Sequence, residues 1–304
     1  MITPHGILVK VKGSNIHLRK MGEGERIIVL LPGLGSPLPT AEFAPLMREL
    51  SKKYTVCTIE LFGYGHSDGT DTPRTNENYV EEIRETLNLA GLKPPYVLMP
   101  HSASGIYCEY YAAKYSEEIA GLILLDSTPT VEGCAIEFAY TEDDIAEMKS
   151  EYESFVEPSE DEVKKAIEEN VAYFTPHGYT EEEIKEICVT PNHADTIFAQ
   201  AISLSSCLTE VIAMPIPKEI PVLAFCSDLD ELRKELKDME LEEGEIQLEL
   251  NKHENYRKGH MDRLGAHAKH VIVDGSTHSD IYYHRSFRNE ICKEIDLFLK
   301  DYIE

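Results

Sequence analysis

The sequence predicts an α/β fold in which a mostly parallel sheet of about eight strands carries helices on both faces. Short apolar runs alternate with longer amphipathic segments through the first 130 residues, the pattern of repeated strand–helix–strand units. A polar helical stretch then interrupts this alternation, and strand-like apolar runs return at 221–225 and 270–273. The length of 304 residues suits one large domain that contains an insertion.

Hydrophobic periodicity gives the individual elements. We expect strands at 6–11, 15–20, 26–31, 54–59, 96–99, 120–125, 221–225 and 270–273. Helices are expected at 41–53, 77–89 and 102–115, through a charged stretch ending near 264, and from about 279 onward. The core therefore comprises 1–130 and 219–304.

The segment 131–218 is predicted to be a helical cap, with helices at 142–155, 160–173 and 181–189. Residues 131–220 contain 21 acidic and 5 basic side chains, a net charge of −16. These carboxylates either form a solvated face or line the rim of a site. The aromatic side chains of the segment should mainly pack the cap's own core, and some could line an acyl pocket: Phe138, Tyr140, Phe155, Tyr173, Phe174 and Phe198.

The overall charge argues against polyanionic partners. The chain has 55 acidic and 29 basic side chains and a formal net charge of −26, so its field would repel nucleic-acid phosphates and anionic lipid headgroups. No apolar run approaches the 18 or so residues of a membrane span. Residues 1–5 lack the pattern of a secretory signal, and we expect a cytoplasmic protein.

Cysteine and histidine spacings do not indicate a metal site. The seven cysteines form no C-x-x-C pair and several lie in apolar runs, so we expect buried free thiols. The histidines at 253, 260, 267 and 270 lack the spacing of zinc ligands and are interpreted as surface residues. No cofactor and no metal are expected.

Ser102 stands at the sharpest local feature, where the apolar strand 96–99 leads directly into a helix. A nucleophilic serine needs this layout, because the tight turn exposes its hydroxyl and the helix N-terminus supplies positive potential for a developing anion. The simpler interpretation is an ordinary helix N-cap. The segment Leu-Pro-Gly-Leu-Gly-Ser at 31–36 favours the catalytic interpretation, since it also follows a buried strand and could provide an oxyanion-hole loop. Its donors would be the backbone N–H groups of Leu34 and Ala103.

Four segments together resemble the α/β-hydrolase superfamily, and in particular its serine esterases with a helical cap. They are 31–36, the Glu-Leu-Phe-Gly-Tyr-Gly-His-Ser-Asp turn at 60–68, His-Ser-Ala-Ser-Gly at 101–105, and Gly-Ser-Thr-His at 275–278. The resemblance covers nearly the whole chain outside the cap and implies the α/β-hydrolase fold. The sequence departs from the family pattern at Pro32, Glu60, Pro100 and Ser104.

The resemblance implies a Ser-Asp-His triad. Ser102 would be the nucleophile and His278, in the loop after the last strand, would be its base. Asp230 falls at the family's acid position when Ser227 is aligned with the usual glycine. Asp228 and Asp126, each near the end of a strand, remain alternatives for the acid.

Such a triad predicts cofactor-free hydrolysis of a small carboxylic ester through an acyl-enzyme. Family members that are haloalkane dehalogenases or epoxide hydrolases use an aspartate nucleophile, which Ser102 replaces here. An aminopeptidase like proline iminopeptidase is an alternative, because cap carboxylates could hold a substrate ammonium group. The second alternative is a small-molecule receptor or a stress-regulator partner that has the hydrolase fold but little turnover. The expected partner is a small uncharged ester, and the oligomeric state cannot be deduced from the sequence.

Overall fold

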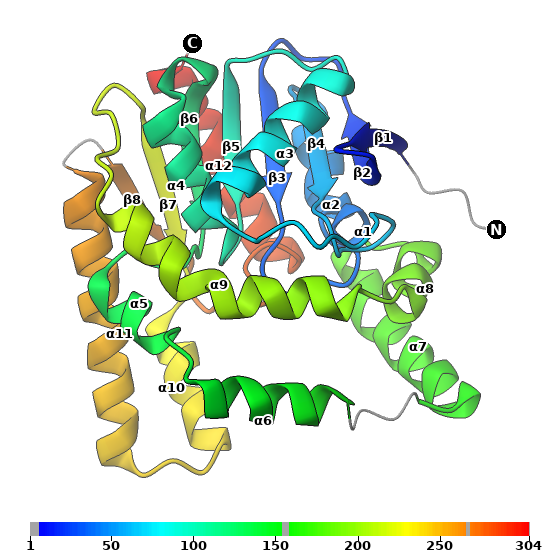
Figure 1. The fold of residues 1–304 in the computed structure, drawn as a ribbon, viewed down its shortest axis with the longest axis vertical. Coiled ribbons are helices and arrows are strands. Elements are labelled where there is room, and N and C mark those ends of the chain that lie inside the picture. The colour runs from blue at the N-terminus through cyan, green and yellow to red at the C-terminus, as the bar shows by residue number, and fades with distance from the viewer. Residues whose placement is uncertain (1–5, 154–157, 266–267, 304) are drawn as a thin grey trace.

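The sheet has eight strands in the order β1-β2-β4-β3-β5-β6-β7-β8 (Figure 1), as seen in a computed structural model that describes residues 6–153, 158–265 and 268–303. β1 and β2 pair antiparallel and the other strands run parallel. This confirms the predicted α/β-hydrolase fold class. The strands are β1 (Ile7–Val11), β2 (Ser14–Met21), β3 (Ile27–Leu31), β4 (Thr55–Glu60), β5 (Tyr96–Pro100), β6 (Ile119–Leu125), β7 (Val222–Cys226) and β8 (Ala268–Ile272).

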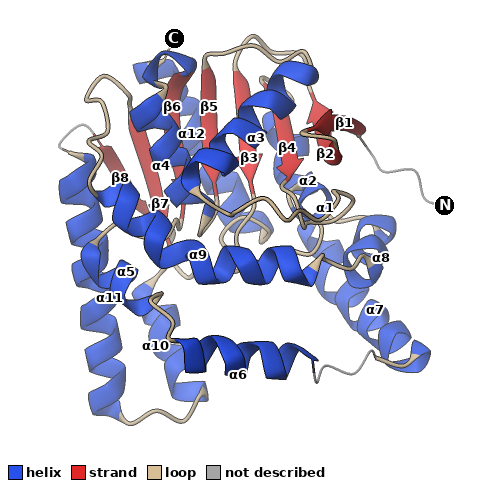
Figure 2. Ribbon diagram, in the orientation of Figure 1, coloured by secondary structure: helices blue, strands red, loops and turns tan. Residues whose placement is uncertain are grey.

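Helices cover both faces of the sheet (Figure 2), because successive strand side chains point to opposite faces. On β3, Val29 and Leu31 pack toward α3 (Asn76–Leu89) and α4 (Ser104–Lys114), whereas Ile28 and Leu30 pack toward α2 (Ala44–Leu50) and α12 (Arg285–Tyr302). Two apolar cores result. The helices outside the insertions are α1 (Pro39–Glu42), α2 (Ala44–Leu50), α3 (Asn76–Leu89), α4 (Ser104–Lys114) and α12 (Arg285–Tyr302), with a short 3₁₀ turn at Ser116–Glu118.

Two predicted helices have different bounds in the structure. The single helix expected at 41–53 is divided into α1 and α2 near Phe43. Pro45 at the start of α2 has no N–H to donate to the preceding turn, which explains the break. The helix expected from about 279 begins only at Arg285, after a run of turns.

The described residues of the inserted segment between β6 and β7 form five helices and a 3₁₀ turn. They are α5 (Glu132–Glu137), α6 (Glu142–Glu153), α7 (Glu160–Phe174), the turn Thr175–His177, α8 (Glu181–Val189) and α9 (Ala194–Ile212). In Figure 1, α9 crosses below the strands, and Thr196 at its start meets Gly63 in the loop after β4. The Arg48 guanidinium attaches α8 to α2 through two hydrogen bonds to Glu183, at 2.5 and 3.1 Å. Phe155, in the predicted helix 142–155, lies outside the described residues.

Two further helices, α10 (Leu229–Asp238) and the 22-residue α11 (Glu243–Leu264), follow β7 and pack against each other. They form the charged stretch predicted before the last strand and extend away from the sheet (Figure 1). None of the helices in the described ranges is long and apolar enough to cross a membrane.

Candidate active site

Ser102 lies in a strained turn between β5 and α4. Its φ of +51° is in the left-handed region, which non-glycine residues seldom adopt. Such strain often occurs at functional sites, because it aims a side chain where relaxed backbone would not. The neighbouring Ser104 is buried, and its hydroxyl donates a hydrogen bond of 2.5 Å to the Pro32 carbonyl. The serine that replaces the family's second glycine thus attaches the turn to the 31–36 loop.

Two glycines permit close packing around this turn. A Cβ on Gly105 would lie 2.5 Å from the Ser127 Cβ, so α4 can approach that loop only without a side chain here. A Cβ on Gly33 would lie 2.8 Å from His101 Nδ1 and 3.1 Å from the Ser102 Cβ. The 31–36 loop therefore lies directly against Ser102.

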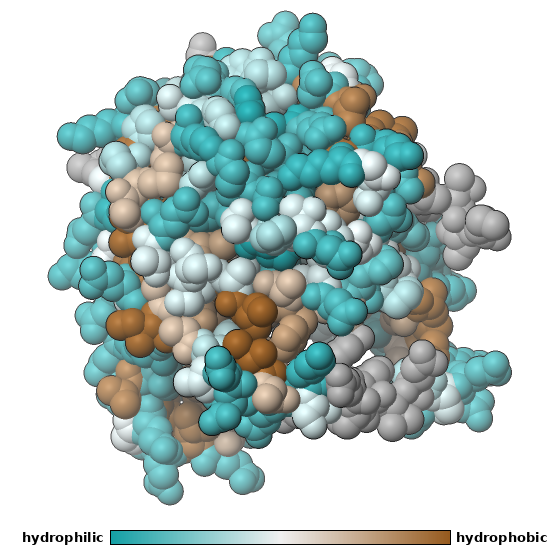
Figure 3. Space-filling model, viewed as in Figure 1, coloured by the Kyte–Doolittle hydropathy of each residue, from teal (hydrophilic) through white to brown (hydrophobic). Residues whose placement is uncertain are grey.

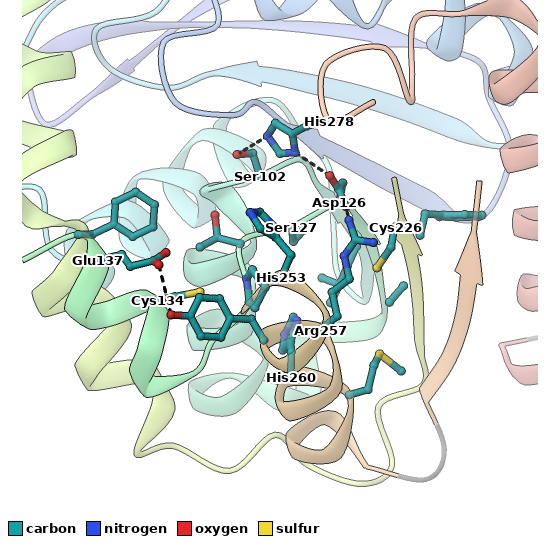
Figure 4. A pocket seen from close by; sticks show the side chains of 18 residues that line it. Ser102, Asp126, Ser127, Cys134, Glu137, Cys226, His253, Arg257, His260 and His278 are labelled. Atoms are coloured by element: carbon teal, nitrogen blue, oxygen red, sulfur yellow. Dashed lines mark hydrogen bonds and ion pairs between the residues drawn. The ribbon is translucent and has the colours of Figure 1, made fainter. Parts of the chain in front are cut away.

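His278 connects Ser102 to a carboxylate (Figure 4). Its Nε2 lies 3.1 Å from Ser102 Oγ, and its Nδ1 lies 2.7 Å from Asp126 Oδ2. A carboxylate can only accept, so Nδ1 carries the proton and Nε2 is free to accept one from the serine. His101 stacks on His278 with ring centroids 4.8 Å apart, and His101 Nε2 donates to the His278 carbonyl at 3.0 Å.

Asp126 follows β6 directly and is held by several donors. The Ser227 N–H donates to Oδ1 at 3.0 Å, and the Ser227 hydroxyl donates to Oδ2 at 2.9 Å. The Arg257 guanidinium lies 3.6 Å from Oδ1. Burial alone would raise the pKa of Asp126, but the hydrogen bond and charge of His278, with Arg257 and the Ser227 N–H, hold that pKa well below its usual range.

The interpretation of Asp230 as the partner of His278 is wrong. Asp230 is an exposed residue in the first turn of α10. Asp228 caps this helix, and its other carboxylate oxygen accepts from the Gly275 N–H at 2.9 Å. The position aligned with the family's glycine, Ser227, hydrogen-bonds the true partner. Because β6 lies between β5 and β7, a carboxylate at its end is next to Ser102, an adjacency that the strand order of the structure reveals.

The pKa values of the two histidines at the site are shifted in opposite directions. Partial desolvation of His278 would lower its pKa, but the hydrogen bond and charge of Asp126 outweigh this and raise the pKa above 6.5. Burial and the neighbouring His278 lower the pKa of His101 to about 3. His101 therefore stays neutral and serves as a hydrogen-bond donor and stacking partner.

The predicted oxyanion donors lie at the two sides of Ser102. Leu34 belongs to the loop that Gly33 holds against the serine, and Ala103 begins the turn into α4. Neither backbone N–H has an acceptor within the described part of the chain. Both are thus available to a bound group, and their role as an oxyanion hole stays a prediction.

Two cavities meet at Ser102 and His278. One, of about 270 Å³, extends toward α5 and α11 and is bounded by Phe138, His253, Tyr256 and Arg257. The other, of about 370 Å³, lies beneath α7 and α8 and is bounded mainly by apolar and aromatic side chains, including Phe174, Tyr179, Ile184, Tyr282 and Tyr283. Phe138 and Phe174, from the predicted aromatic set, thus line opposite cavities.

The histidine and cysteine predictions hold only in part. His260 is not a surface residue: it is 6% exposed and its Nε2 lies 2.6 Å from buried Glu109. His253 lines a cavity, His270 is exposed, and His267 lies outside the described residues. All seven cysteines are free, and four of them are buried. The described residues contain no group of three or more side chains suited to hold a metal ion.

Comparison with known proteins gives the family of the chain. Residues 26–147 match a family described as the alpha/beta hydrolase fold. The uncharacterized protein YbdG of Bacillus subtilis is 36% identical over 121 residues, or 40% of this chain and 37% of that protein. The human serine hydrolase BPHL is 33% identical over 120 residues, or 38% of this chain and 40% of that protein. The chain thus spans less than half the length of these relatives.

Solved structures resemble the fold over nearly the whole chain. E-2-(acetamidomethylene)succinate hydrolase is 20% identical with a TM-score of 0.63, covering 97% of this chain and 98% of that one. The enol-lactonase from Burkholderia xenovorans LB400 is 19% identical with a TM-score of 0.55, covering 97% of this chain and 100% of that one. At these identities the likeness concerns the fold. Residues 26–147 thus match the alpha/beta-hydrolase family, and the eight-stranded sheet to which they contribute has the alpha/beta-hydrolase fold.

Proposed function

We propose that this protein is a serine hydrolase that cleaves a small carboxylic ester through an acyl-enzyme. The observation that carries the proposal is the hydrogen-bonded series from Ser102 through His278 to Asp126. Two similar proteins are named as hydrolases, the serine hydrolase BPHL and 2-(acetamidomethylene)succinate hydrolase, and this is consistent with the proposal. An epoxide hydrolase that attacks through a carboxylate would need that group where Ser102 stands.

The proposed reaction has two halves. Ser102 Oγ forms a bond to the ester carbonyl carbon while its proton passes to His278 Nε2. The Leu34 and Ala103 N–H groups stabilise the oxyanion, and the ester C–O bond then breaks as His278 protonates the departing alcohol. A water molecule then forms a bond to the acyl carbon and gives a proton to His278 Nε2. The bond from that carbon to Ser102 Oγ breaks as His278 returns the proton to the serine, and the carboxylic acid is released.

The two cavities support an ester as substrate. An ester has an acyl arm and an alcohol arm on either side of the carbonyl, and a cavity lies on either side of the Ser102–His278 pair. We propose that the inserted helices α5–α9 act as a cap, since α5 borders one cavity and α7 and α8 border the other. Residues 131–218 would then shape the pocket and leave the chemistry to the core.

The lining disfavours the aminopeptidase alternative. Holding a substrate ammonium group requires a free cap carboxylate near Ser102. The cap residues on the α7–α8 side are uncharged: Asn170, Phe174, Tyr179, Ile184, Ile187 and Cys188. The carboxylate in that lining, Glu42, belongs to the core and already accepts hydrogen bonds from Ser36, the Leu38 N–H and Tyr282. On the other side Glu137 is paired with Lys252 at 2.8 Å.

Steady-state turnover of p-nitrophenyl acetate against an aminoacyl-p-nitroanilide tests the proposal, with Ser102→Ala as the control. We expect hydrolysis of the ester that Ser102→Ala abolishes, and little release from the anilide. Preferential hydrolysis of the anilide would support the aminopeptidase. Absence of turnover on both substrates, with the protein folded, would contradict the esterase and favour a receptor.

A further inference from the structure

Arg257, on the helix inserted between β7 and β8, lies behind the carboxylate of the candidate triad (Figure 4). Its Nη1 donates to the Ser227 carbonyl at 2.8 Å, and its Nη2 donates to the Ser227 hydroxyl at 2.9 Å. A planar guanidinium can make such a two-pronged contact, whereas a lysine ammonium group cannot reproduce it. The contact fixes both the backbone and the side chain of Ser227.

Ser227 passes this constraint to Asp126. Its hydroxyl accepts from Arg257 and donates its own proton to Asp126 Oδ2, while its N–H donates to Oδ1. The Arg257 side chain is 14% exposed and that of Asp126 is 11% exposed, so little water competes for these hydrogen bonds. Asp126 has a positive φ of +39°, a strained backbone conformation. Such a conformation persists only where the surrounding structure supports it.

We infer that Arg257 is a positioning residue that, through Ser227, fixes the Asp126 carboxylate in the orientation that His278 requires. The inference rests on the proposed function, since it assigns Arg257 a part in the same site. It also gives a role to the long α10–α11 insertion, because α11 places the Arg257 cation 3.6 Å from the Asp126 carboxylate. Arg257 contacts neither Ser102 nor His278 through a hydrogen bond of the described residues, so its effect passes through Asp126.

The test measures two variants of Arg257, Arg257→Lys and Arg257→Met. The control is Lys258→Met, which removes an exposed cation from the next position of the same helix. In p-nitrophenyl acetate hydrolysis, Arg257→Met should lower kcat by about tenfold with KM little changed. Arg257→Lys keeps the charge but loses the two-pronged contact, and we expect an intermediate kcat. Lys258→Met should match the wild type.

A double-mutant cycle separates positioning from a general structural role. In an Asp126→Asn background, adding Arg257→Met should change kcat by less than twofold, because the group through which Arg257 acts is already lost. A full tenfold further loss in that background would overturn the inference. So would a kcat within twofold of wild type for Arg257→Met alone. If Arg257→Met does not fold, Arg257→Lys and Ser227→Ala complete the same cycle.

The titration of the His278 ring, followed by NMR, needs no turnover. The Asp126 hydrogen bond raises the pKa of His278, so variants that loosen Asp126 but keep the positive charge, Ser227→Ala and Arg257→Lys, should lower that pKa. An unchanged His278 pKa in both variants would contradict the inference. If no ester is hydrolysed but these shifts appear, the proposed function fails while the positioning role of Arg257 stands.

Discussion

Asp126 controls the proton on His278, because its carboxylate accepts from Nδ1 and leaves Nε2 facing Ser102. An amide at this position would present a donor as readily as an acceptor and would allow the other tautomer. In the proposed reaction, the same carboxylate would also stabilise the imidazolium formed when Ser102 attacks the ester.

Asp126→Asn should therefore lower kcat by about 10⁴ while the protein stays folded. Asp230→Asn is the matched control, since Asp230 is exposed on α10, and should keep near wild-type activity. Measurement of kcat for both variants on p-nitrophenyl acetate decides between the two carboxylates. The opposite ranking would show that the acid is Asp230 after all.

Activity should fall on the acid side with a midpoint above pH 6.5. His278 acts as a base only when neutral, and Asp126 raises the pKa of His278 above 6.5, so kcat/KM declines as pH falls through that raised value. Asp126 stays ionised throughout, because its own pKa is lowered. In Asp126→Asn the midpoint should move to lower pH. A wild-type midpoint at or below 6.5 would be inconsistent with this pairing.

At the scale of elements, the 31–36 loop depends on its close approach to the turn at Ser102. Gly33→Ala should lower kcat by about 10², because the new Cβ would collide with His101 and displace the Leu34 N–H from the oxyanion position. Gly244→Ala adds the same methyl group where nothing lies within 4 Å, and should leave kcat unchanged. Equal activity of both variants would show that the loop has no part in the reaction.

The sequence predicted most strands and helices because each has a clear apolar period. It did not predict α9, whose polar positions are mainly serine and threonine, residues that favour turns and caps over helix interiors; the structure buries Leu204, Leu208 and Val211 against the core. It named Asp126 only as an alternative to Asp230, since the choice between carboxylates after β6 and β7 depends on three-dimensional adjacency. Ser102 and His278 could be located because each lies in a short turn of recognisable composition.

At the scale of the whole molecule, charge is the dominant feature. The net charge is −26, and the face shown in Figure 3 is largely hydrophilic, with scattered small apolar patches. Many of the acidic side chains lie on the exposed surfaces of α6 and α7. The molecule therefore presents a negative field to any approaching substrate.

A neutral ester should be preferred to its carboxylate-bearing analogue, and the preference should weaken with salt. The Debye length falls from about 10 Å at 0.1 M to about 3 Å at 1 M, so the negative field no longer reaches the incoming anion. The ratio of kcat/KM values for the two esters, measured at both salt concentrations, is the observable. A ratio independent of salt would mean that the acidic surface serves only solubility.

The most direct test of a nucleophilic Ser102 is to react the folded protein with a fluorophosphonate and map the adduct by peptide mass spectrometry. The strained turn, the His278 contact and the two free N–H groups predict one adduct, on Ser102, that is lost in Ser102→Ala and slowed in Asp126→Asn. Labelling at another residue, or no labelling of the folded wild-type protein, would contradict the assignment of Ser102 as the nucleophile.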